Sequence, residues 1–321
     1  MPMRATSIPT MLINRLKTWF LRRLYRYMNR KAWQDHLLPP TDVSNLRINL
    51  GEQVVPLRVY HGSGDRPLII YFHGGGWVIG DVNTHDPFCK ILADRSDATV
   101  ISVDYRLAPE HPFPAAHDDC LAASRWILDH LNALPPNNGK VVLSGDSAGG
   151  NLAICTALAL HGEPRLSGCL AIYPAITHYH AGLKSYTEHA KTGPLTTPIM
   201  RWFIDTYLAE TAPADPSTER IFPGRRTGFQ GLPRTLIVTA ERDPLRDDGK
   251  RLALHLQKAG VDVTHQHFPN EAHGFACSEG PTEGHDAFMA LATRWLREGF
   301  NRPASTVQES LAFPEPPASG E

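Results

Sequence analysis

The sequence predicts an α/β protein with a mostly parallel β-sheet that has helices on both of its faces. Two continuous apolar runs, PLIIYF at residues 67–72 and ATVISVDY at residues 98–105, are typical of strands buried on both sides. From there to residue 298, strand patterns and helix patterns alternate along the chain. Repeated strand–helix units form a parallel sheet, because each helix carries the chain back across one face.

Local patterns predict the individual elements. Residues 46–50 and 54–60 alternate like a pair of strands, with a turn at Gly51 and Glu52. Reactive side chains of such sheets lie in loops at the carboxyl ends of the strands. Further strands are expected at 140–143, 167–173, 235–239 and 261–268, and helices at 85–95, 115–131, 148–161, 247–259 and 285–298.

Two segments depart from this alternation. Residues 174–231 are rich in proline and show one helix pattern, at 199–208, but no clear strand. The segment is too long for a plain connection, so we expect a cap inserted into a main domain that spans residues 46–300. Residues 301–321 are rich in Pro, Ser and Glu, which predicts a mobile tail.

Residues 1–45 are predicted to form a basic helical segment of the cap. Eight Lys and Arg residues precede the first acidic residue, Asp35. Two interpretations fit this helix. The favoured one packs its apolar stripe on the rest of the protein, and the other lays the helix on an anionic membrane surface. The stripe consists of Met11, Leu12, Leu16, Trp19, Phe20, Leu24 and Tyr25.

Composition excludes several classes of protein. The 321 residues include 32 basic and 33 acidic ones, so no overall positive charge favours nucleic acid as a partner. The five cysteines are odd in number and contain no CxxC pair, which indicates neither a disulfide framework nor a zinc site. We therefore expect a cytoplasmic protein that needs no metal or cofactor. No apolar run reaches the ~18 residues of a membrane-spanning helix.

The strongest chemical signal is GDSAG at residues 145–149, which lies between a strand and a helix pattern. A serine at the apex of such a sharp turn is held in a strained backbone conformation, and its hydroxyl projects from the sheet. Gly145 and Gly149 keep the strand and the helix from colliding, with Asp146 and Ala148 beside the serine. Ser147 is therefore the predicted nucleophile.

A second signal, HGGGW, follows the strand at 67–72. A glycine run lets backbone amides turn toward an anion without obstruction from side chains. The amides of Gly75 and Gly76, together with that of Ala148, are expected to stabilise an oxyanion. Gly74 belongs to the same loop, and His73 is predicted to brace the loop rather than to act as a base.

A serine nucleophile needs a base and an orienting carboxylate, in the chain order Ser, Asp, His. His273 follows the last predicted strand, at its carboxyl end, and is the predicted base. Asp243 follows the strand at 235–239 and is the predicted acid. Asp247 and Asp248 begin the next helix, where a charge that favours the helix terminus is the simpler interpretation.

Five motifs together resemble the hormone-sensitive-lipase-like family of α/β-hydrolases, in its GDSAG branch. They are HGGGW, VDYRLAPEHPFPAA, GDSAGGN, DPLRDD and EAHGF, in order over about residues 50–300. The nearest resemblance is to bacterial acetyl esterases and other short-chain carboxylesterases. It implies an eight-stranded sheet, a cap over the site, catalytic Ser147, Asp243 and His273, and bracing roles for Arg106 and Glu110.

The expected function is that of a serine carboxylesterase acting on small esters with short to medium acyl chains. A lipase acting on longer chains at a membrane, an amidase or lactonase with the same residues, and a receptor without catalysis remain as alternatives. The sequence leaves the oligomeric state open. Five large side chains either line the substrate pocket or serve as packing: Trp77, Val78, Trp202, Phe203 and Phe275.

Overall fold

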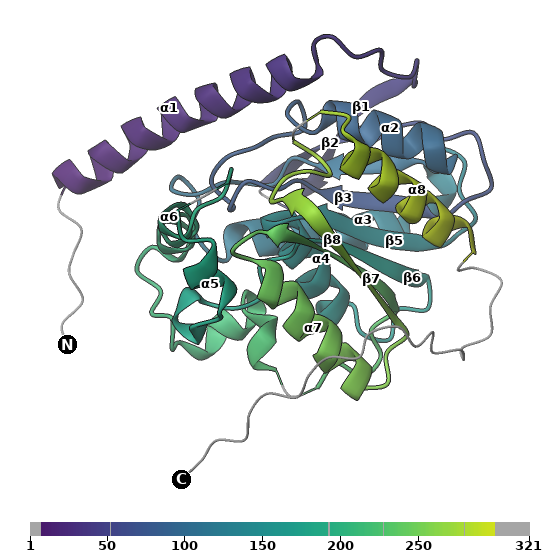
Figure 1. Ribbon diagram of the computed structural model, residues 1–321. Coiled ribbons are helices and arrows are strands. Elements are labelled where there is room, and N and C mark those ends of the chain that lie inside the picture. Colours follow the sequence, from purple (N-terminus) through teal and green to yellow (C-terminus); the bar gives the residue numbers. More distant parts are fainter. Residues whose placement is uncertain (1–7, 52, 192, 227, 279, 299–321) are drawn as a thin grey trace.

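Eight strands form a single mostly parallel sheet in the computed structural model, which describes residues 8–298 except 52, 192, 227 and 279 (Figure 1). The order is β1-β2-β4-β3-β5-β6-β7-β8, with β2 antiparallel to both β1 and β4 and all other pairs parallel. The predicted fold class is confirmed. The strands are β1 (Val43–Leu50), β2 (Gln53–Tyr60), β3 (Leu68–Phe72), β4 (Val100–Val103), β5 (Val141–Asp146), β6 (Leu166–Ile172), β7 (Arg234–Arg242) and β8 (Val263–Ala272).

Helices cover both faces of the sheet, and an apolar core lies between the sheet and the helices on each face. One core lies under α2 (Asp86–Ser96) and α8 (Glu283–Glu298). The other lies under α3 (Ala115–Asp129), α4 (Ala148–Ala159) and α7 (Arg246–Lys258). Strands β3 and β4 are buried along their whole length, as their continuous apolar runs predict.

The last strand is longer than the sequence pattern indicates. β8 runs to Ala272, beyond the predicted end at residue 268, and includes Pro269. A proline is tolerated there because β8 is an edge strand, in which one row of N–H groups has no partner strand. The extension places His273 directly at the carboxyl end of the strand.

Between β6 and β7 the chain forms short helices and, among its described residues, no strand. The longest of these helices, α6 (Thr197–Leu208), matches the predicted helix and begins two residues earlier. It lies at one end of the sheet, next to the N-terminal part of α1 (Figure 1). The others are α5 (Ser185–Glu188), η2 (Tyr179–Ala181), η3 (Pro216–Arg220) and η4 (Pro223–Arg225).

A buried polar chain joins α6 to the helices below it. The Tyr207 hydroxyl lies 2.7 Å from His117 Nδ1, and His117 Nε2 lies 3.1 Å from Asn151 Oδ1. Asn151 Nδ2 also donates to the carbonyls of Ala175 and Ile221. Because the amide nitrogen of Asn151 is used in this way, its oxygen accepts from His117 Nε2–H, and Nδ1 accepts from Tyr207. The network connects α3 and α4 to three points of the segment at 174–231: Ala175, Tyr207 and Ile221.

Helix α1 (Ile8–Trp33) packs with its polar side inward, which corrects the favoured expectation that its apolar stripe faces the protein. Arg22 donates to the carbonyls of Val78 and Ala108 and to the carboxylate of Glu110. These contacts turn the opposite side outward. The stripe residues Leu16, Trp19, Phe20 and Leu24 are exposed as a result, whereas Tyr25 faces the protein. The side chains of Met11 and Leu12 lie outside the described part of the structure.

No helix in the described part of the chain is long and apolar enough to cross a membrane. The predicted tail, residues 301–321, lies outside the described residues.

Burial of His117 predicts a stability that depends on pH. Burial lowers the pKa of His117 to about 3, well below that of the unfolded chain. The unfolded state therefore binds the additional proton as the pH falls below about 6.5, and the free energy of unfolding decreases. We expect His117→Gln to remove up to about 2 kcal/mol of the decrease between about pH 6.5 and pH 5, measured by urea denaturation. An identical pH dependence in the variant and the parent would contradict this assignment.

Candidate active site

The serine of GDSAG lies at a sharp turn between β5 and α4. Ser147 has φ 57° and ψ −117°, a conformation that is unfavourable for a side chain with a Cβ. The turn is held by its amide, which donates to the Ile172 carbonyl at 2.8 Å. A Cβ on Gly149 would overlap the Phe72 carbonyl, and one on Gly145 would overlap the backbone of Gly149. Glycine at both positions is therefore required by the close approach of strand, turn and helix.

Three predicted residues from distant parts of the chain meet at this turn. His273 Nε2 lies 3.1 Å from Ser147 Oγ, and His273 Nδ1 lies 2.8 Å from Asp243 Oδ2. The Asp243 side chain is fully buried, and its other oxygen accepts from the amide of Leu245. With Asp243 accepting a hydrogen bond from Nδ1–H of His273, Nε2 accepts from the serine hydroxyl. This is the arrangement that activates a serine for attack on a carbonyl carbon.

The glycine loop, residues 73–77, follows β3 beside this turn. Gly75 and Gly76 have φ of +116° and +61°, which residues with a side chain rarely adopt. A Cβ on Gly75 would overlap the Ile79 carbonyl, and one on Gly76 would overlap the Phe203 ring. Within the described part of the chain, the N–H groups of Gly75, Gly76 and Ala148 donate to no other residue. These three amides are available to an anion.

Asp146 connects the glycine loop to the nucleophile turn. Its Oδ1 accepts from the Gly74 amide at 2.8 Å and from the Tyr71 hydroxyl at 2.6 Å. His85 Nε2 lies 3.4 Å from the same oxygen. Burial alone would raise the pKa of Asp146, but His85 and the hydrogen bond from Tyr71 together hold it below its usual value. The carboxylate thus stays charged and keeps the two loops in register.

His73 lies within the loop and supports it rather than meeting Ser147. Its Nδ1 is 2.8 Å from the Gly74 carbonyl, and its ring stacks on Tyr105 at 4.3 Å between centroids. The Tyr105 hydroxyl donates to the His73 carbonyl. Burial, with a contribution from nearby His85, lowers the pKa of His73 to about 4, so the imidazole is neutral near pH 7.

Two residues with a positioning role are not identified by the sequence reasoning. Asp248, interpreted as a helix-terminus charge, is fully buried and accepts from the amides of Ile176 and Thr177. It also accepts from the Tyr186 hydroxyl at 2.6 Å, so it fixes the start of the segment at 174–231. Asn151 fixes the same segment from α4. Full burial of a carboxylate is the signal that reveals Asp248, and only the structure shows it.

The five pocket candidates separate into two groups. Trp77, Val78 and Phe275 are buried. Trp77 stacks on Tyr207 of α6, and Phe275 packs in the core on the α8 side. Phe203 lies against Gly76 in the glycine loop. Its neighbour Trp202 lies beneath the Lys17 ammonium of α1, 4.3 Å from the ring centroid.

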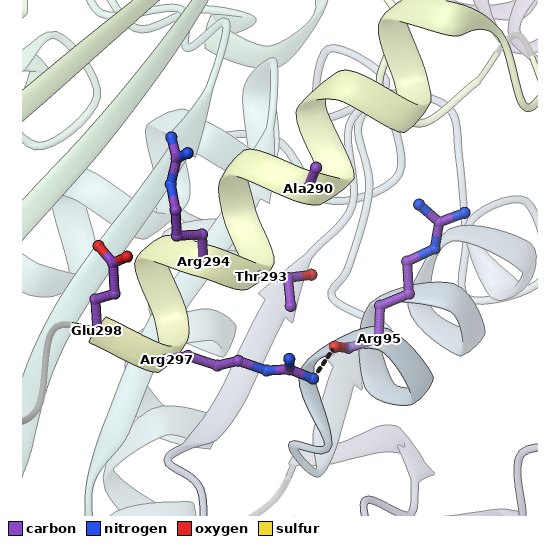
Figure 2. A pocket seen from close by; sticks show the side chains of 6 residues that line it. All are labelled: Arg95, Ala290, Thr293, Arg294, Arg297 and Glu298. Atoms are coloured by element: carbon purple, nitrogen blue, oxygen red, sulfur yellow. Dashed lines mark hydrogen bonds between the residues drawn. The ribbon is translucent and has the colours of Figure 1, made fainter.

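A surface pocket of about 530 Å³ is remote from this chemistry (Figure 2). It lies between α2 and α8, and the guanidinium of Arg297 reaches across it to the Arg95 carbonyl. None of the predicted site residues lines it. Ser147 itself is only 9% exposed. Among the described residues no cluster of His, Cys, Asp or Glu is suited to hold a metal ion.

Comparison with known proteins identifies the class of this fold and site. Residues 69–277 match the family described as "alpha/beta hydrolase fold". A carboxylesterase, NlhH of Mycobacterium tuberculosis, is 39% identical over 252 residues, which are 74% of this chain and 78% of that protein. An ethyl acetate hydrolase of Pseudomonas putida is 34% identical over 270 residues, or 81% and 83% of the two chains.

Solved structures agree with these relatives. The thermophilic carboxylesterase EstE1, cloned from a metagenomic library, has a TM-score of 0.83 at 32% identity. The superposition covers 89% of this chain and 98% of the EstE1 chain. An esterase of the archaeon Pyrobaculum calidifontis has a TM-score of 0.79 at 34% identity, with 87% and 90% covered.

The chain belongs to the α/β-hydrolase family. Within it, the carboxylesterase relatives confirm the predicted hormone-sensitive-lipase-like branch and the predicted enzyme class, a carboxylic ester hydrolase.

The contact between Asp146 and the glycine loop predicts that two substitutions of Asp146 have different effects. Asp146→Ala leaves the Gly74 amide and the Tyr71 hydroxyl without an acceptor, at about 1–3 kcal/mol of unfolding free energy for each. We expect kcat/KM for ester hydrolysis to fall about 100-fold as the loop moves. Asp146→Asn keeps an oxygen for both donors and should retain most of the activity. Equal losses in the two variants would show that charge, not loop position, is what matters.

Proposed function

We propose that the protein is a serine carboxylesterase that hydrolyses small esters through an acyl-enzyme, with Ser147, His273 and Asp243 as its catalytic triad. The observation that carries this proposal is the continuous chain of hydrogen bonds from Asp243 through His273 to Ser147, at a strained turn. The amides of Gly75, Gly76 and Ala148 are proposed as the oxyanion hole. A receptor without catalysis is disfavoured because it would need none of these contacts.

The reaction begins when His273 Nε2 accepts the proton of Ser147 as Oγ attacks the ester carbonyl. The oxygen of the tetrahedral intermediate takes up negative charge and accepts from the three amides of the oxyanion hole. His273 then returns the proton to the departing alcohol, which leaves an acyl group on Ser147. Water, deprotonated by His273, attacks this acyl group and releases the acid. Asp243 orients the imidazole and stabilises its charged form throughout.

Residues 1–45 and 174–231 are proposed as a cap over this triad, and the second of these segments is an insertion within a catalytic domain at 46–300. The proximity of Phe203 to Gly76 supports a short acyl slot, because the ring occupies space beside the proposed oxyanion hole. This favours substrates with short to medium acyl chains over the long chains of a lipase. An amide or a lactone could react with the same catalytic residues and amides. The shape of the substrate pocket therefore determines which of these substrates the enzyme accepts.

We also propose that the enzyme works in the reducing cytoplasm. All five cysteines are free thiols in the structure, and four of them are buried. Burial raises the pKa of Cys89, Cys120 and Cys277, which keeps these thiols protonated and unreactive.

A chain-length series of p-nitrophenyl esters, from acetate to palmitate, tests the proposal. We expect kcat/KM to be greatest for short to medium acyl chains, and Ser147→Ala to reduce kcat by about 10⁴-fold or more. A maximum at palmitate would make the protein a lipase. A folded protein with no activity on any ester would refute the esterase and require tests on amides and lactones.

Phe203 is expected to limit the acyl chain. Phe203→Ala opens space beside Gly76, so the ratio of kcat/KM for octanoate to that for acetate should rise about tenfold. Ile199→Ala, at an exposed side chain of the same helix, is the matched control and should leave the ratio unchanged. An unchanged ratio in Phe203→Ala would show that the acyl chain binds elsewhere.

A further inference from the structure

Helix α1 exposes a row of large apolar side chains that no described residue covers. Four of them, Leu16, Phe20, Leu24 and Met28, recur every fourth residue and share one side of the helix with Trp19 and Tyr27. All six are between 40% and 63% exposed. We call these six residues the outer face of α1. A continuous apolar row of this kind on the surface of a protein generally marks an interaction site.

Specific contacts hold the opposite side of α1 on the protein, so the outer face is displayed in a fixed orientation. Besides the three contacts of Arg22, Arg26 forms an ion pair with Asp81 at 2.7 Å, and the Tyr25 hydroxyl lies 3.2 Å from Ser278 Oγ. Trp33, at the end of the helix, is buried in the core beside α8. Rotation of α1 to bury the outer face would break all of these contacts.

The charge beside the outer face is positive. Lys17, Arg23, Arg30 and Lys31 are exposed next to the apolar row. The first 34 residues hold eight of the 32 basic residues and none of the 33 acidic ones, so the rest of the chain is net negative. Two outer faces brought together in a dimer would place like charges side by side. A negatively charged surface with an apolar interior complements both properties.

We propose that the outer face of α1 docks the protein on an anionic phospholipid bilayer, with the helix parallel to the membrane plane. The apolar side chains enter the boundary between headgroups and acyl chains, Trp19 and Tyr27 lie at the level of the headgroups, and the basic residues meet lipid phosphates. This surface role goes beyond ester hydrolysis and does not depend on it.

Docking in this orientation brings the candidate active site close to the lipid. Arg22 of α1 holds the carbonyl of Val78, two residues beyond Gly76 in the chain. Lys17 lies over Trp202, the neighbour of Phe203. Figure 1 shows α1 along one side of the molecule, with α6 next to its N-terminal part. Apolar esters dissolved in the bilayer would therefore reach the cap directly.

Co-sedimentation of the full-length protein with vesicles tests the proposal. We expect binding to phosphatidylcholine vesicles that contain phosphatidylglycerol, much weaker binding to pure phosphatidylcholine, and release by salt. The double variant Phe20→Glu, Leu24→Glu should weaken binding at least about tenfold. Arg30→Ala with Lys31→Ala should weaken it roughly 25-fold, since each basic residue near the surface contributes roughly fivefold.

The matched control is Leu254→Glu with Lys258→Ala, at exposed positions one turn apart on α7, which should bind vesicles like the parent. Hydrolysis of p-nitrophenyl acetate without vesicles should be unchanged in all these variants, which verifies folding independently of docking. No binding of the parent to phosphatidylglycerol vesicles would overturn the proposal. So would a dimer that Phe20→Glu, Leu24→Glu converts to monomers without any effect on sedimentation, since the outer face would then join two copies of the chain.

Discussion

The site depends on the close approach of two loops. One is the turn after β5, and the other is the glycine loop after β3. Phe72 and Gly145 are paired in neighbouring parallel strands, so both loops leave the sheet at the same height. The two loops lie so close together that a Cβ on Gly149 would overlap Phe72 and one on Gly74 would overlap Asp146. The strained serine and the glycine loop, which carries two of the proposed oxyanion amides, therefore lie close together before any substrate binds, and acyl transfer requires such preorganisation.

The segment at 174–231 is attached beside the same two loops. Asn151, one helical turn after Ser147, donates to its carbonyls at Ala175 and Ile221, and Asp248 of α7 holds its beginning. Helix α1 is in turn fixed to carbonyls just beyond the glycine loop. The parts that would select substrate or meet a membrane are thus attached directly to the parts proposed to do the chemistry. Of the residues of α1, Arg22 makes these contacts, whereas the outer face of the helix points away from them.

The sequence predicts what short-range patterns determine. The parallel sheet, the turn at Ser147 and the glycine loop follow from apolar runs and glycine spacing, and His273 and Asp243 follow from their places after strands. What it misses depends on distant partners. Hydropathy alone predicts that the apolar side of α1 faces the protein. The polar side does so instead, because Arg22 binds carbonyls more than fifty residues away in the chain. Likewise, the buried role of Asp248 depends on amides 71 and 72 residues away.

The proposed mechanism requires the hydroxyl of Ser147 to carry the acyl group during turnover. Mass spectrometry of the protein after reaction with p-nitrophenyl dimethylcarbamate tests this, because the carbamoyl product on serine hydrolyses slowly. We expect one carbamoyl group per chain, located on the peptide that contains Ser147, with loss of esterase activity in proportion. A label on another residue with loss of activity, or full loss of activity without a covalent label, would contradict the role of Ser147.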